Sequence, residues 1–173
     1  ADDFGELTPD GGSMYRELSV DWPNDPWVNI LKTGNLLQQM AFYGDDPSVG
    51  RVQDALAYLE RHWRDANTDP GWGYSLSVSA YQAMFTTMKG LETMGVDLID
   101  TDGDGQTDDD WYNQEPPVSP AQDFASVLVA QQIKTHGDIN GDTIDDYGSW
   151  PQSIWDYENN RILSTTWALL TLE

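Results

Sequence analysis

Apolar residues recur at helical spacing in several parts of the chain. Val52, Leu56, Leu59 and Trp63 follow one another at steps of three or four, which places them on one face of a helix. Comparable spacing predicts five helices, over residues 25–44, 47–64, 77–93, 119–131 and 162–172. No segment alternates between apolar and polar residues for long enough to predict a strand. The pattern therefore predicts an all-α fold.

Capping residues suggest where these helices begin and end. Asp25-Pro26 and Asp46-Pro47 each offer an N-cap followed by proline at the first helical position. Ser119-Pro120-Ala121-Gln122 combines that signal with a capping box. Gly44 and Gly95 are predicted to end two of the helices, because glycine adopts the left-handed conformation that stops a helix.

Two pairs of matching segments indicate an internal repeat in the chain. Residues 53–59 match residues 122–128, and residues 79–86 match residues 164–171. Each copy is predicted to consist of a helix, a turn containing Gly and Trp, and a second helix, and such helix pairs must stack on their neighbours to bury both faces. Residues 1–24, rich in Gly, Asp and Pro, are expected to be irregular, and residues 25–173 to form the repeat domain.

The residues of this repeat resemble those of the prenyltransferase and squalene cyclase family. The likeness rests on five segments, Val52 to Leu59, Gly71-Trp72-Gly73, Asp110-Trp111-Tyr112, Gln131 with Gly148-Ser149-Trp150, and Ser164 to Glu173. It covers residues 27–173 and implies helix pairs arranged as a partial α/α toroid. The interval between Gln131 and Gly148 is longer here than in that family, because an acidic segment is inserted.

The catalytic motifs that the resemblance would imply do not occur in this sequence. Terpene cyclases of the family use Asp-x-Asp-Asp or Asp-Asp-x-x-Asp, and its protein prenyltransferases need a zinc set that includes cysteine, which this chain lacks. We therefore predict no catalytic residue and expect a non-catalytic structural or binding module. The alternative is a fragment of a terpene cyclase-like or polysaccharide-active enzyme.

The net charge of the chain argues against some classes of binding partner. The chain has 30 acidic and 8 basic residues and a net charge of -22, which repels nucleic acid and anionic membrane surfaces but suits cations. No apolar run approaches the roughly 20 residues that span a bilayer. We expect neither nucleic-acid binding nor membrane insertion.

The first of two acidic segments has the ligand spacing of a calcium loop. Side-chain oxygens stand at positions 1, 3, 5 and 9, a backbone carbonyl is available at position 7, and glycine occupies position 6. The predicted ligands are Asp100, Asp102, Asp104, Gln106 and Asp108. Position 12 is Trp111 and not the glutamate of an EF-hand, so the loop more closely resembles those of dockerins and thrombospondin type 3 repeats. Asp109 and Asp110 are alternatives for closing the site, and a solvated acidic turn is the alternative to metal binding.

The second acidic segment repeats the spacing less completely. Its predicted ligands are Asp138, Asn140, Asp142 and Asp146, but Thr143 replaces the turn glycine. One calcium ion is thus expected in the first loop and a second is possible in the other. Because calcium loops of micromolar affinity stay loaded outside the cell, they favour an extracellular or cell-surface location.

Histidine and tryptophan residues are also considered as candidates for catalysis or for exposed contacts. His62 and His136 are expected at the surface or at helix ends, without a catalytic role. Trp72 and Trp150 occupy equivalent turns and are expected in the core, whereas Trp22, Trp27 and Trp155 are candidates for exposed contacts.

The number of helices leads to an expectation about assembly. Five helices are about half of what a closed toroid of the resembled family uses. An exposed apolar face is therefore predicted, covered by a second copy of the chain or by another protein.

Overall fold

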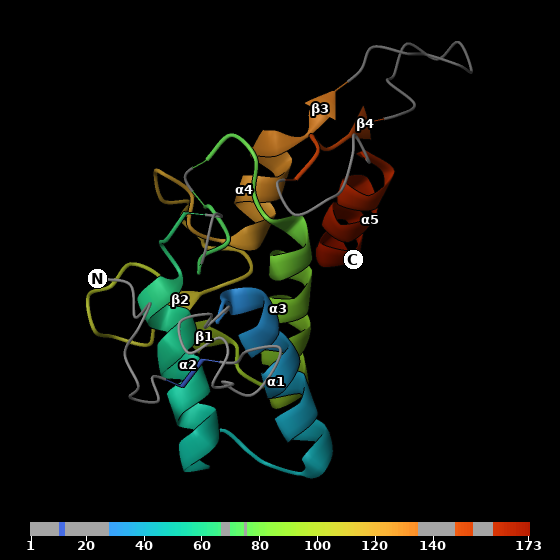
Figure 1. The fold of residues 1–173 in the computed structure, drawn as a ribbon. Coiled ribbons are helices and arrows are strands. Elements are labelled where there is room, and N and C mark those ends of the chain that lie inside the picture. The colour runs from blue at the N-terminus through green and yellow to red at the C-terminus, as the bar shows by residue number, and fades with distance from the viewer. Residues whose placement is uncertain (1–10, 13–27, 67–69, 75, 135–147, 154–160) are drawn as a thin grey trace, which may run out of the picture.

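The computed structural model describes residues 11–12, 28–66, 70–74, 76–134, 148–153 and 161–173. Five helices contain about half of these residues (Figure 1). They are α1 (Ile30–Tyr43), α2 (Gly50–His62), α3 (Tyr81–Met94), α4 (Phe124–Gln131) and α5 (Arg161–Leu172).

The fold is mainly helical, as predicted, but it is not plainly all-α. Strand β1 (Leu98–Ile99) pairs antiparallel with β2 (Asp109–Asp110), and β3 (Ile133–Lys134) pairs antiparallel with β4 (Gly148–Ser149). Each strand has two residues, too few for alternation to reveal it in the sequence. The described helices alone do not trace a ring, so the toroid stays a prediction.

The predicted helix ends are confirmed at their glycine stops. Gly44 follows α1 with a φ of 99°, and Gly95 follows α3 with a φ of 73°, and the amide of each bonds back to the last turn. The last helix also agrees with its predicted span, 162–172.

The predicted starts of the first two helices are wrong, since both helices begin several residues later in the chain. Asn29 caps α1, its side chain accepting from the amide of Lys32 at 3.1 Å, whereas Asp25 and Pro26 lie outside the described residues. Asp46 does not open α2; it accepts from the amide of Ser48 at 2.7 Å and forms a turn before the helix begins at Gly50.

The capping box predicted at Ser119 is also wrong. Helix α4 begins at Phe124, because Asp123 accepts from the amide of Ser126 at 2.7 Å and thereby caps it. A buried carboxylate is a stronger partner for these amides than a serine hydroxyl. Similarly, α3 begins at Tyr81 and not at residue 77.

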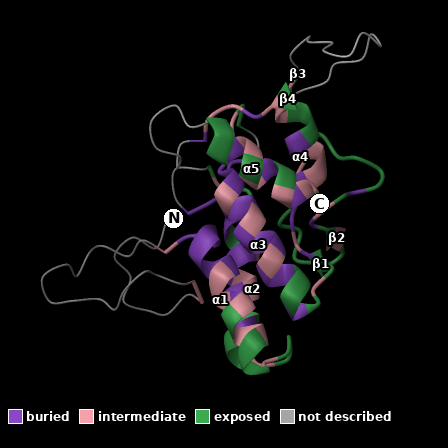
Figure 2. Cartoon of the chain, turned by 90° about the vertical axis from the view of Figure 1, so that its right-hand side faces the viewer, coloured by how far each residue is buried: buried purple, intermediate pink, exposed green. Residues whose placement is uncertain are grey.

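Helix α3 packs against both α1 and α5, while α2 contacts α1 and α4 contacts α5. Figure 2 shows buried residues gathered where α1 and α3 meet. The two helices approach closely at Gly34 and Gly90, since a Cβ at Gly90 would lie 2.4 Å from the carbonyl oxygen of Gly34. Helices α1, α3 and α5 therefore form a packed row, and the loops that carry the acidic residues connect to these helices and to their neighbours.

An aromatic cluster joins α2 to α4. The ring of Phe124 stacks on Trp63 with centroids 4.9 Å apart and meets Trp72 edge-on at 5.0 Å. Trp111 contacts the same ring at 5.9 Å. The predicted core positions of Trp72 and Trp150 are confirmed, because both side chains are almost fully buried.

Gln131 joins the two predicted repeats. Its side chain accepts from the amide of Ser79 at 3.1 Å and from the hydroxyl of Tyr81 at 2.9 Å, and it donates to the carbonyl of Leu76 at 2.8 Å. These bonds reach the start of α3, in the preceding repeat, and not the turn at Gly148–Ser149. The contact ties α4 to α3.

Candidate metal centre

The first acidic segment forms the loop of a β-hairpin. Strands β1 and β2 pair Ile99 with Asp109, and the loop closes between them. Trp111, directly after β2, is buried and donates from Nε1 to the carbonyl of Val96 at 2.7 Å. Position 12 of the predicted calcium loop is therefore a core anchor, which fixes the hairpin at the end of α3.

The loop is held in shape by its own carboxylates. Asp100 accepts from the amides of Gly103 and Gly105, at 2.6 and 2.9 Å. Asp102 and Asp104 each accept from an amide two residues further along, at 3.0 and 2.8 Å. Both glycines have positive φ, 78° and 88°, so the tight turn needs residues without a Cβ here.

Three carboxylates converge at the base of this loop. Asp100, Asp102 and Asp109 can each place one oxygen within 4.8 Å of the other two. Asp109 belongs to β2, and its Oδ2 accepts from the amide and the hydroxyl of Thr101 at 2.9 and 2.6 Å. Like charges at such distances repel one another, water screens the repulsion in part because Asp102 is exposed, and a cation between them would offset it.

A short hydrogen-bond chain behind the cluster orients Asp109. Gln114 donates from Nε2 to the hydroxyl of Thr101 at 2.7 Å, and that hydroxyl donates to Asp109. Gln114 and Thr101 are both buried. Partners of this kind are what hold a ligating carboxylate in one orientation.

The predicted ligands divide into two sets. Asp100 and Asp102 belong to the cluster, and Asp109, one of the two alternatives for closing the site, supplies the third carboxylate. Asp104, Gln106 and Asp108 are exposed and are not part of this group. Their role as ligands stays a prediction.

The second acidic segment occupies a comparable place in the topology. Residues 135–147, which include Asp138, Asn140, Asp142 and Asp146, lie outside the described residues. The segment connects β3 to β4, as the first connects β1 to β2. Each acidic segment therefore connects two strands that pair with each other.

Two residues that the sequence did not point to also contact the loop, namely Glu60 of α2 and Arg64, which lies two residues beyond the end of that helix. Oε1 of Glu60 accepts from the amide of Asp100 at 3.3 Å, and Nη1 of Arg64 donates to the carbonyl of Asp102. Burial raises the pKa of Glu60 and the charge of Asp100 raises it further, against the opposing effects of the Asp100 amide and of Arg61. Glu60 lies within α2 and Arg64 in the turn that follows it, and neither position belongs to a local motif that would signal a site.

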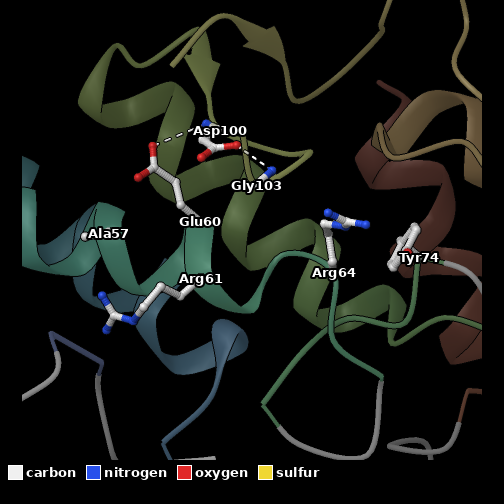
Figure 3. Close-up of a pocket in the computed structure, with 7 residues that line it drawn as sticks. All are labelled: Ala57, Glu60, Arg61, Arg64, Tyr74, Asp100 and Gly103. Carbon is white, nitrogen blue, oxygen red and sulfur yellow. Dashed lines mark hydrogen bonds between the residues drawn. The ribbon is translucent and has the colours of Figure 1, made fainter. Parts of the chain in front are cut away.

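A cavity of about 580 Å³ lies between α2 and the loop (Figure 3). Seven residues line it, namely Ala57, Glu60, Arg61, Arg64, Tyr74, Asp100 and Gly103. Asp100 is common to the cavity and the carboxylate cluster, so the two features adjoin.

The structure also describes one of the two histidines that were considered as candidates. His62 is the last residue of α2, as expected of a helix-end histidine, but it is buried, and its Nδ1 lies 2.7 Å from Oδ2 of Asp65. His136, Trp22, Trp27 and Trp155 lie outside the described residues. Within the described part, no helix is both long and apolar enough to cross a bilayer.

Comparison with known proteins adds no assignment, because no family model, curated protein or solved structure matches this chain. The likeness to the prenyltransferase and squalene cyclase repeat stays an expectation from the sequence. The functional interpretation therefore rests on the geometry of the loop.

Proposed function

We propose that this chain is a non-catalytic helical module, stabilised by calcium, of a secreted or cell-surface protein. The observation that carries the proposal is the convergence of Asp100, Asp102 and Asp109 within 4.8 Å of one another. A chain with a net charge of -22 attracts cations to such a cluster.

The donor chemistry favours calcium. All three groups offer oxygen, the ligand atom preferred by hard cations, and the loop has further carboxylates and carbonyls close in sequence. Thiolate ligands are excluded because the chain has no cysteine. Calcium accepts six to eight oxygen ligands in flexible geometry, so water could complete a set begun by the three carboxylates.

The proposed role of the ion is structural. Bound calcium supplies the positive charge that offsets repulsion among the three carboxylates. Asp109 connects the cluster to β2, while Glu60 connects the loop backbone to α2 and Arg64 connects it to the turn after α2. Loss of the ion is therefore expected to loosen the hairpin from α2.

An extracellular or cell-surface location belongs to the same proposal. Calcium is abundant outside cells, where a site of micromolar affinity remains occupied.

The proposal includes a partial toroid that associates through its last helix. The row α1, α3, α5, flanked by α2 and α4, supports an arrangement of stacked helix pairs. On α5, Ile162 and Leu169 are seven residues apart and therefore share a face, and they are 81% and 54% exposed. This face is proposed to meet a second copy or another protein.

Calorimetric titration with calcium tests the assignment of the cluster. Asp109→Asn keeps an oxygen that can accept from Thr101 but removes the charge, so calcium affinity is expected to fall by roughly tenfold or more. Asp54→Asn removes an exposed carboxylate on α2, outside both the loop and the cluster, and is the matched control, with an expected change of less than about threefold. Equal losses in the two variants, or no calcium binding by the wild type, would contradict the assignment.

A further inference from the structure

The cavity between α2 and the acidic loop is lined by polar groups that the fold leaves largely unused. Glu60 accepts one hydrogen bond through Oε1, and Arg64 donates one through Nη1 to the carbonyl of Asp102. In the described part of the chain, the second carboxylate oxygen of Glu60, the remaining guanidinium donors of Arg64 and the hydroxyl of Tyr74 have no hydrogen-bond partner. These groups are available to a ligand.

The residues that line the cavity place a carboxylate, a guanidinium group and an aromatic ring around it. In Figure 3, Glu60 points from α2 towards Asp100 and Gly103, and Arg64 stands between the loop and Tyr74. Arg61 extends the other way, away from Arg64. The cavity thus offers an acceptor at one side and a fork of donors beside an aromatic ring at the other.

Charge limits the ligands that fit. Anions are disfavoured by the net charge of -22 and by Glu60 and Asp100 in the wall. Cations are disfavoured by the guanidinium of Arg64, and the carboxylate cluster next to the cavity competes for them. A neutral molecule with many hydroxyl groups matches the wall, since each hydroxyl both donates and accepts hydrogen bonds.

We propose that this cavity binds a neutral saccharide. Glu60 accepts from a sugar hydroxyl, Arg64 donates to hydroxyl or ring oxygens, and Tyr74 offers an aromatic face for the C–H groups of the ring together with a hydroxyl at its edge. The volume of about 580 Å³ is within the range of pockets that hold small ligands. None of these contacts uses a metal ion, so the inference stands apart from the calcium site.

Titration of the complete chain with defined sugars tests the proposal. Maltose, cellobiose and lactose are the neutral probes and galacturonate is the anionic one, each followed by calorimetry and by saturation-transfer NMR in millimolar calcium. At least one neutral disaccharide is expected to bind saturably. Arg64→Gln and Tyr74→Ala are each expected to weaken that binding by about tenfold, because each removes a principal contact.

Matched variants separate this site from the others. Arg161→Gln makes the same change of charge at an exposed position of α5 and is expected to leave sugar affinity unchanged. Asp109→Asn changes no residue that lines the cavity, and at a calcium concentration that saturates the variant it is expected to keep sugar affinity, so each proposal can fail without the other. The saccharide site is overturned if no neutral probe binds, if only galacturonate binds, or if Arg64→Gln and Tyr74→Ala, shown by circular dichroism to be folded, bind as the wild type does.

Discussion

At the scale of single residues, Glu60 shows how the loop and α2 influence each other. Burial raises its pKa above the ordinary value of 4.5, the charge of Asp100 acts in the same direction, and the hydrogen bond from the Asp100 amide opposes both. A raised pKa means that the folded state holds the proton more tightly than the unfolded state. Protonated Glu60 therefore contributes stability below its unfolded-state pKa, and that contribution is lost as the pH rises through its folded-state pKa.

Glu60→Gln is expected to remove this pH dependence. Glutamine keeps an oxygen for the Asp100 amide but never ionises, so the variant should gain stability relative to the wild type as the pH rises from about 4 to about 7. Urea unfolding in the presence of a chelator measures the difference without a contribution from bound cations. Parallel stability profiles for the two proteins across this pH range would contradict the stated cause of the shift.

Only part of the site could be predicted at this scale. Asp100 and Asp102 are recognisable because calcium loops have a local spacing, and Asp109 was one of two alternatives for closing the site. Glu60 and Arg64 were missed because their contacts join residues about 40 positions apart, and no local pattern reports such a distance. Trp111 was recognised as unsuitable for a ligand, but its role as an anchor depends on Val96 and Phe124.

At the scale of elements, α4 depends on a single buried cap. Asp123 is fully buried, and its Oδ1 accepts from the amide of Ser126 at 2.7 Å. The helix has only eight residues, too few to be stable alone, so the cap and the packing of Phe124 on Trp63 and Trp72 must stabilise it together.

Asp123→Ala is expected to lower the free energy of unfolding by about 1–2 kcal/mol, because the amide of Ser126 loses its partner. Asp123→Asn is the matched control, since asparagine caps a helix about as well as aspartate, and it should cost less. Urea unfolding compares the two variants with the wild type. A loss in Asp123→Asn at least as large as in Asp123→Ala would show that the charge, and not the cap, stabilises α4.

The C-terminal ends of two helices could be predicted from the sequence, whereas the N-terminal ends of the helices could not. The stops at Gly44 and Gly95 were predictable because a left-handed residue acts locally. The starts were not, because Asn29 and Asp123 prevailed over neighbouring caps with equally good local signals. The short strands escaped prediction because pairing such as Leu98 with Asp110 is fixed by the hairpin and its anchor, and not by alternation.

At the scale of the whole molecule, an acidic surface and an apolar helix face have opposite effects on assembly. A net charge of -22 keeps copies of the chain apart at low ionic strength. Ile162 and Leu169 on α5 expose apolar surface that association would bury. Self-association is therefore expected to strengthen with added salt.

Leu169→Ser is expected to reduce the average mass measured by light scattering at high protein concentration and moderate salt. Phe42→Ser is the matched control, because Phe42 is 77% exposed in the last turn of α1, and Figure 1 shows that end of α1 on the opposite side of the helical row from α5. A wild-type mass that stays monomeric at every concentration, or an equal effect of the two variants, would contradict association through α5.

Thermal unfolding with calcium and with EDTA, at matched ionic strength, measures whether a calcium ion stabilises this fold. Calcium at about 100 times its dissociation constant adds about 2.7 kcal/mol of stability, which should raise the Tm by roughly 5–10 °C for a chain of this size. At the same calcium concentration, Asp109→Asn with a tenfold weaker affinity should lose about half of that response or more. A Tm that is the same in calcium and in EDTA would contradict the claim.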